Sequence, residues 1–278
     1  MRNFLPVLRS SLTIMTPLLF AAAGGLFPAL AGTLNIALEG LLLIGAFSAM
    51  AVFYFTGSFI AAVLAAIASS LALSCLHAFA AFKLRANVFI AGLAVNLLST
   101  GITVLLSGKI FKSKGVIVSQ HQFTSPDIYP FAALFLLVIL WTVIYKTPFG
   151  YRLRACEKNS ASLASLGINP QDYQIAALLI CGICCGIGGS FLSLNLGAFV
   201  PGMSSGRGWI ALVIIFLGGK KPHGILAAAF IFALAEAFSI YAQGLWKIPA
   251  DFVFIFPYVC TLIALILVNK PAVRQHPQ

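Results

Sequence analysis

Long runs without a charged side chain constrain this sequence more than any other feature. They are Ser10–Leu38, Gly40–Phe82, Ala86–Gly108, Ile128–Tyr145, Tyr173–Gly206 and Phe252–Asn269. A helix that crosses a bilayer needs about 20 apolar residues, so several runs hold one crossing and some hold two. Only 8% of the residues are charged, against roughly 25% in a soluble domain, which is too few to cover a water-facing surface. The sequence predicts an all-α, polytopic membrane helical bundle.

Polar connections divide the runs into about nine transmembrane segments, within a range of about eight to ten. The expected crossings are 11–31, 35–55, 58–82, 87–108, 128–146, 173–195, 206–219, 223–244 and 251–269. The seventh is short for a full crossing, and a re-entrant segment before residue 56 stays open as an alternative. The glycines between Gly182 and Gly189 predict a helix face that another backbone approaches closely. We expect a single transmembrane domain over residues 1–278.

Basic residues gather on one predicted side of the membrane. Alternation of the crossings puts Lys83 with Arg85, the segment 146–172, Lys220 with Lys221, and the C-terminal tail on the same side. Cytoplasmic loops collect Lys and Arg, so this side is expected to face the cytoplasm. Loop placement explains the net charge of +11, and no nucleic-acid partner is predicted.

The polar segment, residues 146–172, is an island in a chain otherwise composed for lipid. It predicts a short helix with Asn159 or the serine after it as N-cap, Leu163 and Leu166 on one face, and Gly167 as C-cap. Two helical turns are marginal in isolation, so this helix must pack on something. A connector lying on its own bundle is one interpretation. We favour the other, in which the two leucines dock to a partner.

Two acids, Glu39 and Glu236, lie within apolar segments. An ionisable group at membrane depth costs at least ~2.5 kcal/mol, so it faces the bundle interior or a water-filled path. For Glu39, with Asn35 four residues earlier on the same face, a place on the substrate pathway and hydrogen bonding to a neighbouring helix stay equal alternatives. A structural or boundary role suits Glu236 better. Asn96 completes the candidate pathway residues, although hydrogen bonding between helices is its default interpretation.

The motifs of catalysis and of metal binding are missing from the sequence. It has no G-x-x-x-x-G-K-[ST] phosphate loop, no pairing of a nucleophile with a base, and only scattered histidines. Cys181, Cys184 and Cys185 lack histidine partners and a polar surrounding, so they are interpreted as small buried hydrophobes. We predict no catalytic residue, no metal and no cofactor.

Four stretches in matching order and spacing, within about residues 12–268, resemble a known family. They are Gly32–Ala46, Arg85–Leu98, Phe149–Ile168 and Ser204–Gly219. They resemble the permease subunits of bacterial ABC importers in the ribose and branched-chain amino acid permease superfamily. The asparagine and glutamate of the first stretch, Asn35 and Glu39, are typical of the branch associated with purine nucleosides and, in some bacteria, riboflavin.

The third stretch resembles the cytoplasmic segment that couples such a permease to its ATPase. The resemblance implies a coupling role for Gly150, Arg152, Arg154, Glu157, Asn159, Leu163, Leu166 and Gly167. The family usually has Gly-Glu-Asn-Pro where this chain has Glu-Lys-Asn-Ser at 157–160. Because the asparagine alone matches in place, the contacts of the family's glutamate do not carry over to Glu157.

The resemblance implies an ABC importer permease fold and several partners. These are two cytoplasmic ATPase domains, a second and non-identical permease subunit, and an external substrate-binding protein or lipoprotein. The chain itself is then no enzyme, because ATP hydrolysis lies on a separate subunit. The expected location is the bacterial cytoplasmic (inner) membrane, where the chain is multi-pass and surrounded by lipid.

The expected cargo is a small polar solute. A nucleoside or a flavin such as riboflavin comes first, and a simple sugar comes second. The rival from another class is an ion-coupled secondary transporter with Glu39 as the proton or cation site. An intramembrane enzyme is disfavoured, since Glu39 and Glu236 have no His or Asp companion at helical spacing.

Overall fold

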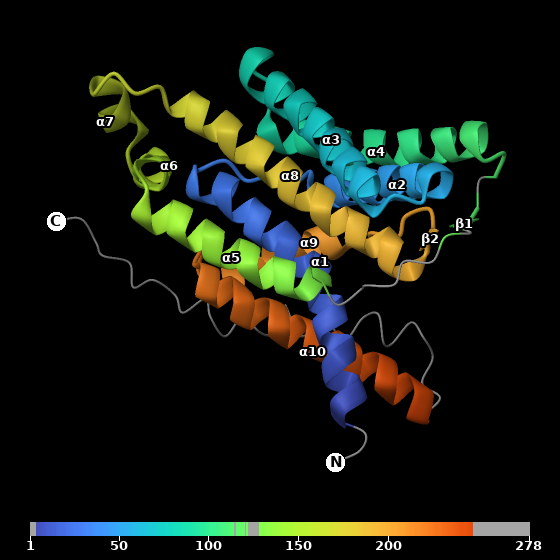
Figure 1. Ribbon diagram of the computed structural model, residues 1–278. Helices are drawn as coiled ribbons and strands as arrows, with labels where there is room; N and C mark the ends of the chain where they lie inside the picture. Colours follow the sequence, from blue (N-terminus) through green and yellow to red (C-terminus); the bar gives the residue numbers. More distant parts are fainter. Residues whose placement is uncertain (1–3, 114, 120, 122–127, 247–278) are drawn as a thin grey trace.

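The computed structural model describes residues 4–113, 115–119, 121 and 128–246. Helices account for almost all of the regular structure in this part (Figure 1). In chain order the elements are α1 (Phe4–Leu30), α2 (Leu38–Thr56), α3 (Phe59–Ala78), the π-helix η1 (Phe79–Lys83), α4 (Val88–Ile110), β1 (Ile117–Val118), α5 (Ile128–Lys146), α6 (Pro148–Lys158), α7 (Ser160–Ser165), α8 (Pro170–Leu196), β2 (Ala198–Phe199), α9 (Arg207–Leu217) and α10 (Pro222–Trp246). The two strands pair antiparallel and join the α4–α5 connection to the α8–α9 connection. The predicted all-α membrane bundle is confirmed.

Seven of the described helices are long and apolar enough to cross a membrane, namely α1, α2, α3 with η1, α4, α5, α8 and α10. The crossing expected at 206–219 forms α9, whose 11 residues rise about 16 Å, roughly half of the hydrocarbon core. The crossing expected at 251–269 lies outside the described residues. The count of about nine segments is therefore not confirmed: the described part holds seven helices of crossing length and one shorter apolar helix, α9.

The centre of the bundle is built from α1, α2 and α8, with the other long helices around them (Figure 1). Of the spanning stretches, 83% of α1 and 61% of α8 are buried, against 28% in α3, α4 and α5. The outer helices expose large apolar side chains such as Ile60, Leu97 and Phe131. Such faces suit contact with lipid.

The glycines of α8 are the places where neighbouring backbones come closest. A Cβ on Gly186 would lie 2.7 Å from the Ala66 carbonyl oxygen of α3, and one on Gly189 would lie 2.8 Å from the Ala46 nitrogen of α2. A Cβ on Gly188 would lie 2.9 Å from Phe20 Cβ of α1. The glycine face predicted from the sequence is confirmed, and it lets α8 contact three helices.

Three of the basic regions predicted to share one side of the membrane lie at the same end of the bundle. Lys83 ends η1 and, with Gln171 of α8, lines one shallow apolar hollow. Lys220, between α9 and α10, pairs with Glu157 of α6. The predicted grouping of Lys83, the polar segment and Lys220 is confirmed for the described residues, while the C-terminal tail lies outside them.

Candidate functional site

The polar side chains in the bundle interior surround the turn between α1 and α2. Within this turn Gly32 adopts a φ of +74°, in the region that favours glycine. The buried Asn35 accepts the Ala37 N–H at 2.9 Å and donates to Cys181 Sγ of α8 at 3.2 Å. This asparagine therefore holds the turn and fixes it to the central helix.

Asn96 of α4 contacts the same turn from the other side. Its Nδ2 donates to the Ile36 carbonyl at 3.0 Å, and its Oδ1 accepts the Gly40 N–H at 2.8 Å. A Cβ on Gly40 would lie 2.8 Å from both Asn96 Cα and Ser99 Oγ, so α2 and α4 touch here. Asn96 thus satisfies the Gly40 N–H, a donor that the start of α2 leaves without a helical partner, and a carbonyl of the preceding turn. The default interpretation, hydrogen bonding between helices, describes its contacts.

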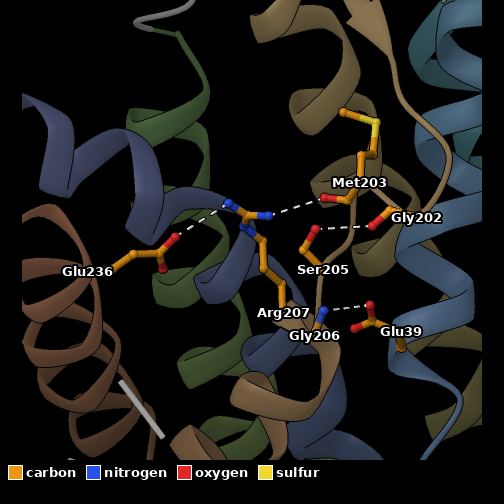
Figure 2. A network of polar contacts seen from close by, with 7 residues as sticks. All are labelled: Glu39, Gly202, Met203, Ser205, Gly206, Arg207 and Glu236. Carbon is orange, nitrogen blue, oxygen red and sulfur yellow. Dashed lines mark hydrogen bonds and ion pairs between the residues drawn. The ribbon is translucent and has the colours of Figure 1, made fainter. Parts of the chain in front are cut away.

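Glu39, in the first turn of α2, caps the N-terminus of α9 from outside that helix. One carboxylate oxygen accepts the Gly206 N–H at 2.8 Å and the other accepts the Gly208 N–H at 2.7 Å; the first of these bonds is drawn in Figure 2. A Cβ on Gly208 would collide with the backbone of Leu38 and Glu39. A carboxylate at a helix N-terminus offsets the positive end of the helix dipole and satisfies free N–H groups.

Of the two interpretations left open for Glu39, the structure supplies direct contacts for the hydrogen bonding to a neighbouring helix. Helix ends inside a bundle form substrate and ion sites in transporters, and Glu39 lies at such an end. Its place on a substrate pathway stays a prediction.

Glu236 of α10 faces Arg207, the first residue of α9 (Figure 2). The Arg207 Nη2 lies 3.5 Å from Glu236 Oε1, and its Nη1 donates to the Met203 carbonyl at 3.2 Å. The buried Nε of Arg207 has no hydrogen-bond partner among the described residues. Sequence reasoning missed Arg207, although it is the sole basic residue between Lys158 and Lys220. The pair fits the structural interpretation given to Glu236.

The polar segment contains two helices instead of one. The additional helix, α6, has Thr147 as its N-cap, whose hydroxyl accepts the Gly150 N–H at 3.3 Å, and a proline at its first position. Gly150 lies so close to the last turn of α5 that a Cβ would collide with the carbonyls of Val143 and Ile144. Gly150 is therefore the close contact at which the chain bends from α5 into α6.

The two arginines of α6 contact aromatic rings. Arg152 donates to the Tyr173 hydroxyl at 2.9 Å. The Arg154 guanidinium lies 4.8 Å from the ring centre of Tyr145 and 5.0 Å from that of Tyr151. These contacts hold α6 against the ends of α5 and α8.

The predicted short helix exists as α7, with the predicted N-cap; its C-cap is Leu166, one residue before the predicted Gly167. Asn159 is its N-cap and accepts the Ser162 N–H at 3.1 Å, and Gly167 follows with a φ of +74°. The prediction that the two leucines share one face is wrong, because Leu163 is 6% exposed and Leu166 is 74% exposed. Leu166 already lies past the last helical residue, with a φ of −87° and a ψ of 8°, so it leaves the stripe that helical spacing predicts.

Glu157, at the end of α6, forms an ion pair with Lys220. The Lys220 Nζ also lies 3.5 Å from the Ala29 carbonyl at the end of α1. Lys220 was expected from the sequence only as a marker of the basic side. Among the described residues, no group of three or more His, Cys, Asp or Glu could hold a metal ion.

Comparison with known proteins gives matches over almost the whole chain. The model of the family described as branched-chain amino acid transport system / permease component matches residues 7–265. The guanosine ABC transporter permease protein NupQ of Bacillus subtilis is 32% identical over 93% of this chain and 90% of its own. The nucleoside ABC transporter permease protein NupC of Lactococcus lactis is 30% identical over 94% of this chain and 91% of its own.

A solved structure shares the fold. A chain of PsaBC from Streptococcus pneumoniae in complex with Fab superposes with a TM-score of 0.60. The superposition covers 97% of this chain and 93% of that chain, at 12% sequence identity. At this identity the likeness concerns the arrangement of the helices alone.

Proposed function

The chain belongs to the family of permease components of branched-chain amino acid transport systems, and from this membership we propose that it forms half of the translocation pathway of an ATP-driven importer of nucleosides. The family is one of transport permeases and not of enzymes. The resemblance found in the sequence is thereby confirmed, and the chain is a multi-pass protein of the bacterial cytoplasmic membrane.

One observation carries the choice of cargo. Two relatives that cover more than nine tenths of this chain are named for guanosine and for nucleosides. Neither of these names mentions a flavin or a sugar, so riboflavin and simple sugars serve below as competing substrates. Of the two residues that carry the resemblance to this branch, Glu39 binds the N-terminus of the half-length helix α9 and Asn35 contacts α8.

The polar segment supports docking of a separate ATPase subunit. Its helices α6 and α7 stand at the end of the bundle where basic residues gather, and Arg152, Asn159 and Leu166 are exposed there. ATP-driven closure of two ATPase domains pushes on this segment and tilts the helices joined to it. The pathway, shared with a second and non-identical permease, then opens alternately to each side, and an external binding protein delivers the nucleoside.

Uptake of radiolabelled guanosine into proteoliposomes tests the proposal. The vesicles contain this chain with its ATPase, its second permease and the external binding protein. We expect uptake that requires ATP, persists with a proton ionophore, and falls when unlabelled adenosine competes but not when riboflavin or glucose does. Uptake that persists without the ATPase and collapses with the proton gradient would overturn the proposal in favour of an ion-coupled secondary transporter.

A further inference from the structure

The half-length helix α9 is held at both ends by acids from other elements. At its N-terminus Glu39 of α2 accepts two backbone N–H groups (Figure 2 shows the Gly206 bond). Beyond its C-terminus Glu157 of α6 pairs with Lys220. One helix thus joins the polar segment to the acid in the bundle interior.

Lys220 is positioned by its backbone as well as by its side chain. Its φ is +53°, a left-handed conformation that a residue with a side chain seldom adopts. Its N–H bonds to the Ile215 carbonyl at 3.0 Å and closes the last turn of α9. The ammonium group lies 6.0 Å from the ring centre of Phe216 and contacts the Ala29 carbonyl. This conformation directs the ammonium group of Lys220 to α6.

The end of α6 also touches the α1–α2 turn. A Cβ on Gly32 would lie 3.2 Å from Glu157 Cα, so the two backbones are in contact. Gln174 of α8 donates to the Ala31 carbonyl of the same turn at 3.2 Å. Glu157 is therefore the residue at which α6, the α1–α2 turn and the end of α9 meet.

We propose that Lys220 is a positioning residue that transmits the displacement of α6 to α9 through its ion pair with Glu157, and through α9 to Glu39. The inference rests on the proposed function, in which an ATPase displaces α6. Glycines in the left-handed region flank the helix, Gly206 with a φ of +83° and Gly219 with a φ of +61°. In this proposal α9, which lies between these two turns, moves as one rigid rod.

The ion pair matters for position more than for stability. Its side chains are 30% and 35% exposed, and pairs as exposed as these contribute little to folding. Variants of this pair are therefore expected to fold and assemble. Lys221 offers a matched control, since it is the next residue, carries the same charge and has no described side-chain partner.

The test compares Lys220→Glu, Glu157→Lys, the double exchange Glu157→Lys/Lys220→Glu, and Lys221→Glu in the complete importer. Three quantities are measured, namely the ATPase that co-purifies, the ATP hydrolysed, and the guanosine taken up per ATP. We expect each single reversal to retain the ATPase and to lower uptake per ATP about tenfold. The double exchange restores uptake, and Lys221→Glu leaves it unchanged.

A second measurement follows α9 without using the substrate. A cysteine replaces Ser205, beside the N-terminus of α9, in a chain with Ser at positions 75 and 260. Maleimide labelling is compared with and without ATP plus vanadate. We expect trapping to change the labelling rate in the native pair and in the double exchange, but not in Lys220→Glu. If trapping changes the labelling rate in Lys220→Glu as it does in the native pair, or if that variant takes up guanosine fully, the inference alone is overturned. Absence of the ATPase from the unmodified complex would overturn the proposed function with it.

Discussion

At the scale of single residues, two acids and one arginine place their charges inside the bundle. The Glu39 carboxylate lies on the N-terminus of α9, which carries about half a positive charge. Arg207 and Glu236 offset each other at 3.5 Å. The cluster is thus close to neutral, which is how charged groups become tolerable at membrane depth.

Glu39→Gln is expected to destabilise the protein by about 1–2 kcal/mol, because it removes the charge that caps α9 and turns an amide N–H toward a backbone donor. We also expect slower guanosine uptake with normal assembly of the complex. Thermal unfolding of the purified chain and uptake by the complex measure the two effects.

Asp172→Asn is the control for this change. Asp172 also lies in the first turn of a helix, but it is exposed and accepts its hydrogen bond from Asn169 within the same turn. Its replacement is expected to alter stability by no more than a few tenths of a kcal/mol, about 0.3. Equal melting temperatures for Glu39→Gln and the native chain would show that the cap contributes nothing.

At the scale of the elements, the sequence predicted the long helices well and the polar segment in part. Apolar runs of crossing length became α1 to α5, α8 and α10. The N-cap of α7 was predicted because Asn159 suits that position whatever surrounds it, and Gly167 marks the end of the helix one residue past its C-cap, Leu166. Helix α6 was missed, since its N-cap at Thr147 and its packing at Gly150 depend on the end of α5.

The two leucines of the polar segment are expected to behave differently. Leu166→Glu places a charge on an exposed surface, so we expect unchanged folding and loss of most of the ATPase that co-purifies. Leu163→Glu buries a charge without a partner and is expected to destabilise the chain by several kcal/mol, about 3. Thermal unfolding and co-purification separate the two cases. Full ATPase binding by Leu166→Glu would move the docking surface away from α7.

At the scale of the whole molecule, the two ends of the bundle differ in charge and in structure. One end has Lys83, the polar segment and Lys220, and the other has the paired strands β1 and β2 (Figure 1). Under the proposed function we expect the first end to face the cytoplasm, because cytoplasmic loops collect Lys and Arg. We then expect the strands to face outward, on the side of the proposed binding protein.

Cysteine labelling in intact cells tests this orientation. Val116→Cys, beside β1, is expected to react with a membrane-impermeant maleimide, whereas Ser165→Cys on α7 is expected to react only after the cells are opened. The background carries Ser at positions 75 and 260. The native Cys156 interferes little, because burial raises the pKa of its thiol and keeps it protonated at neutral pH. Labelling of Ser165→Cys in closed cells would reverse the assignment.

The sequence by itself determined the class of the molecule, the lengths of its outer helices and the identity of its intramembrane acids. These follow from local properties, since an apolar run of crossing length must be a helix in lipid and a charge inside it must find a partner. The tertiary structure alone decided which partner each polar group has. Glu39 meets Gly208 across 169 positions of the chain, and Glu157 meets Lys220 across 63. Such contacts depend on how the helices pack, because no local pattern records which two ends of a bundle lie together.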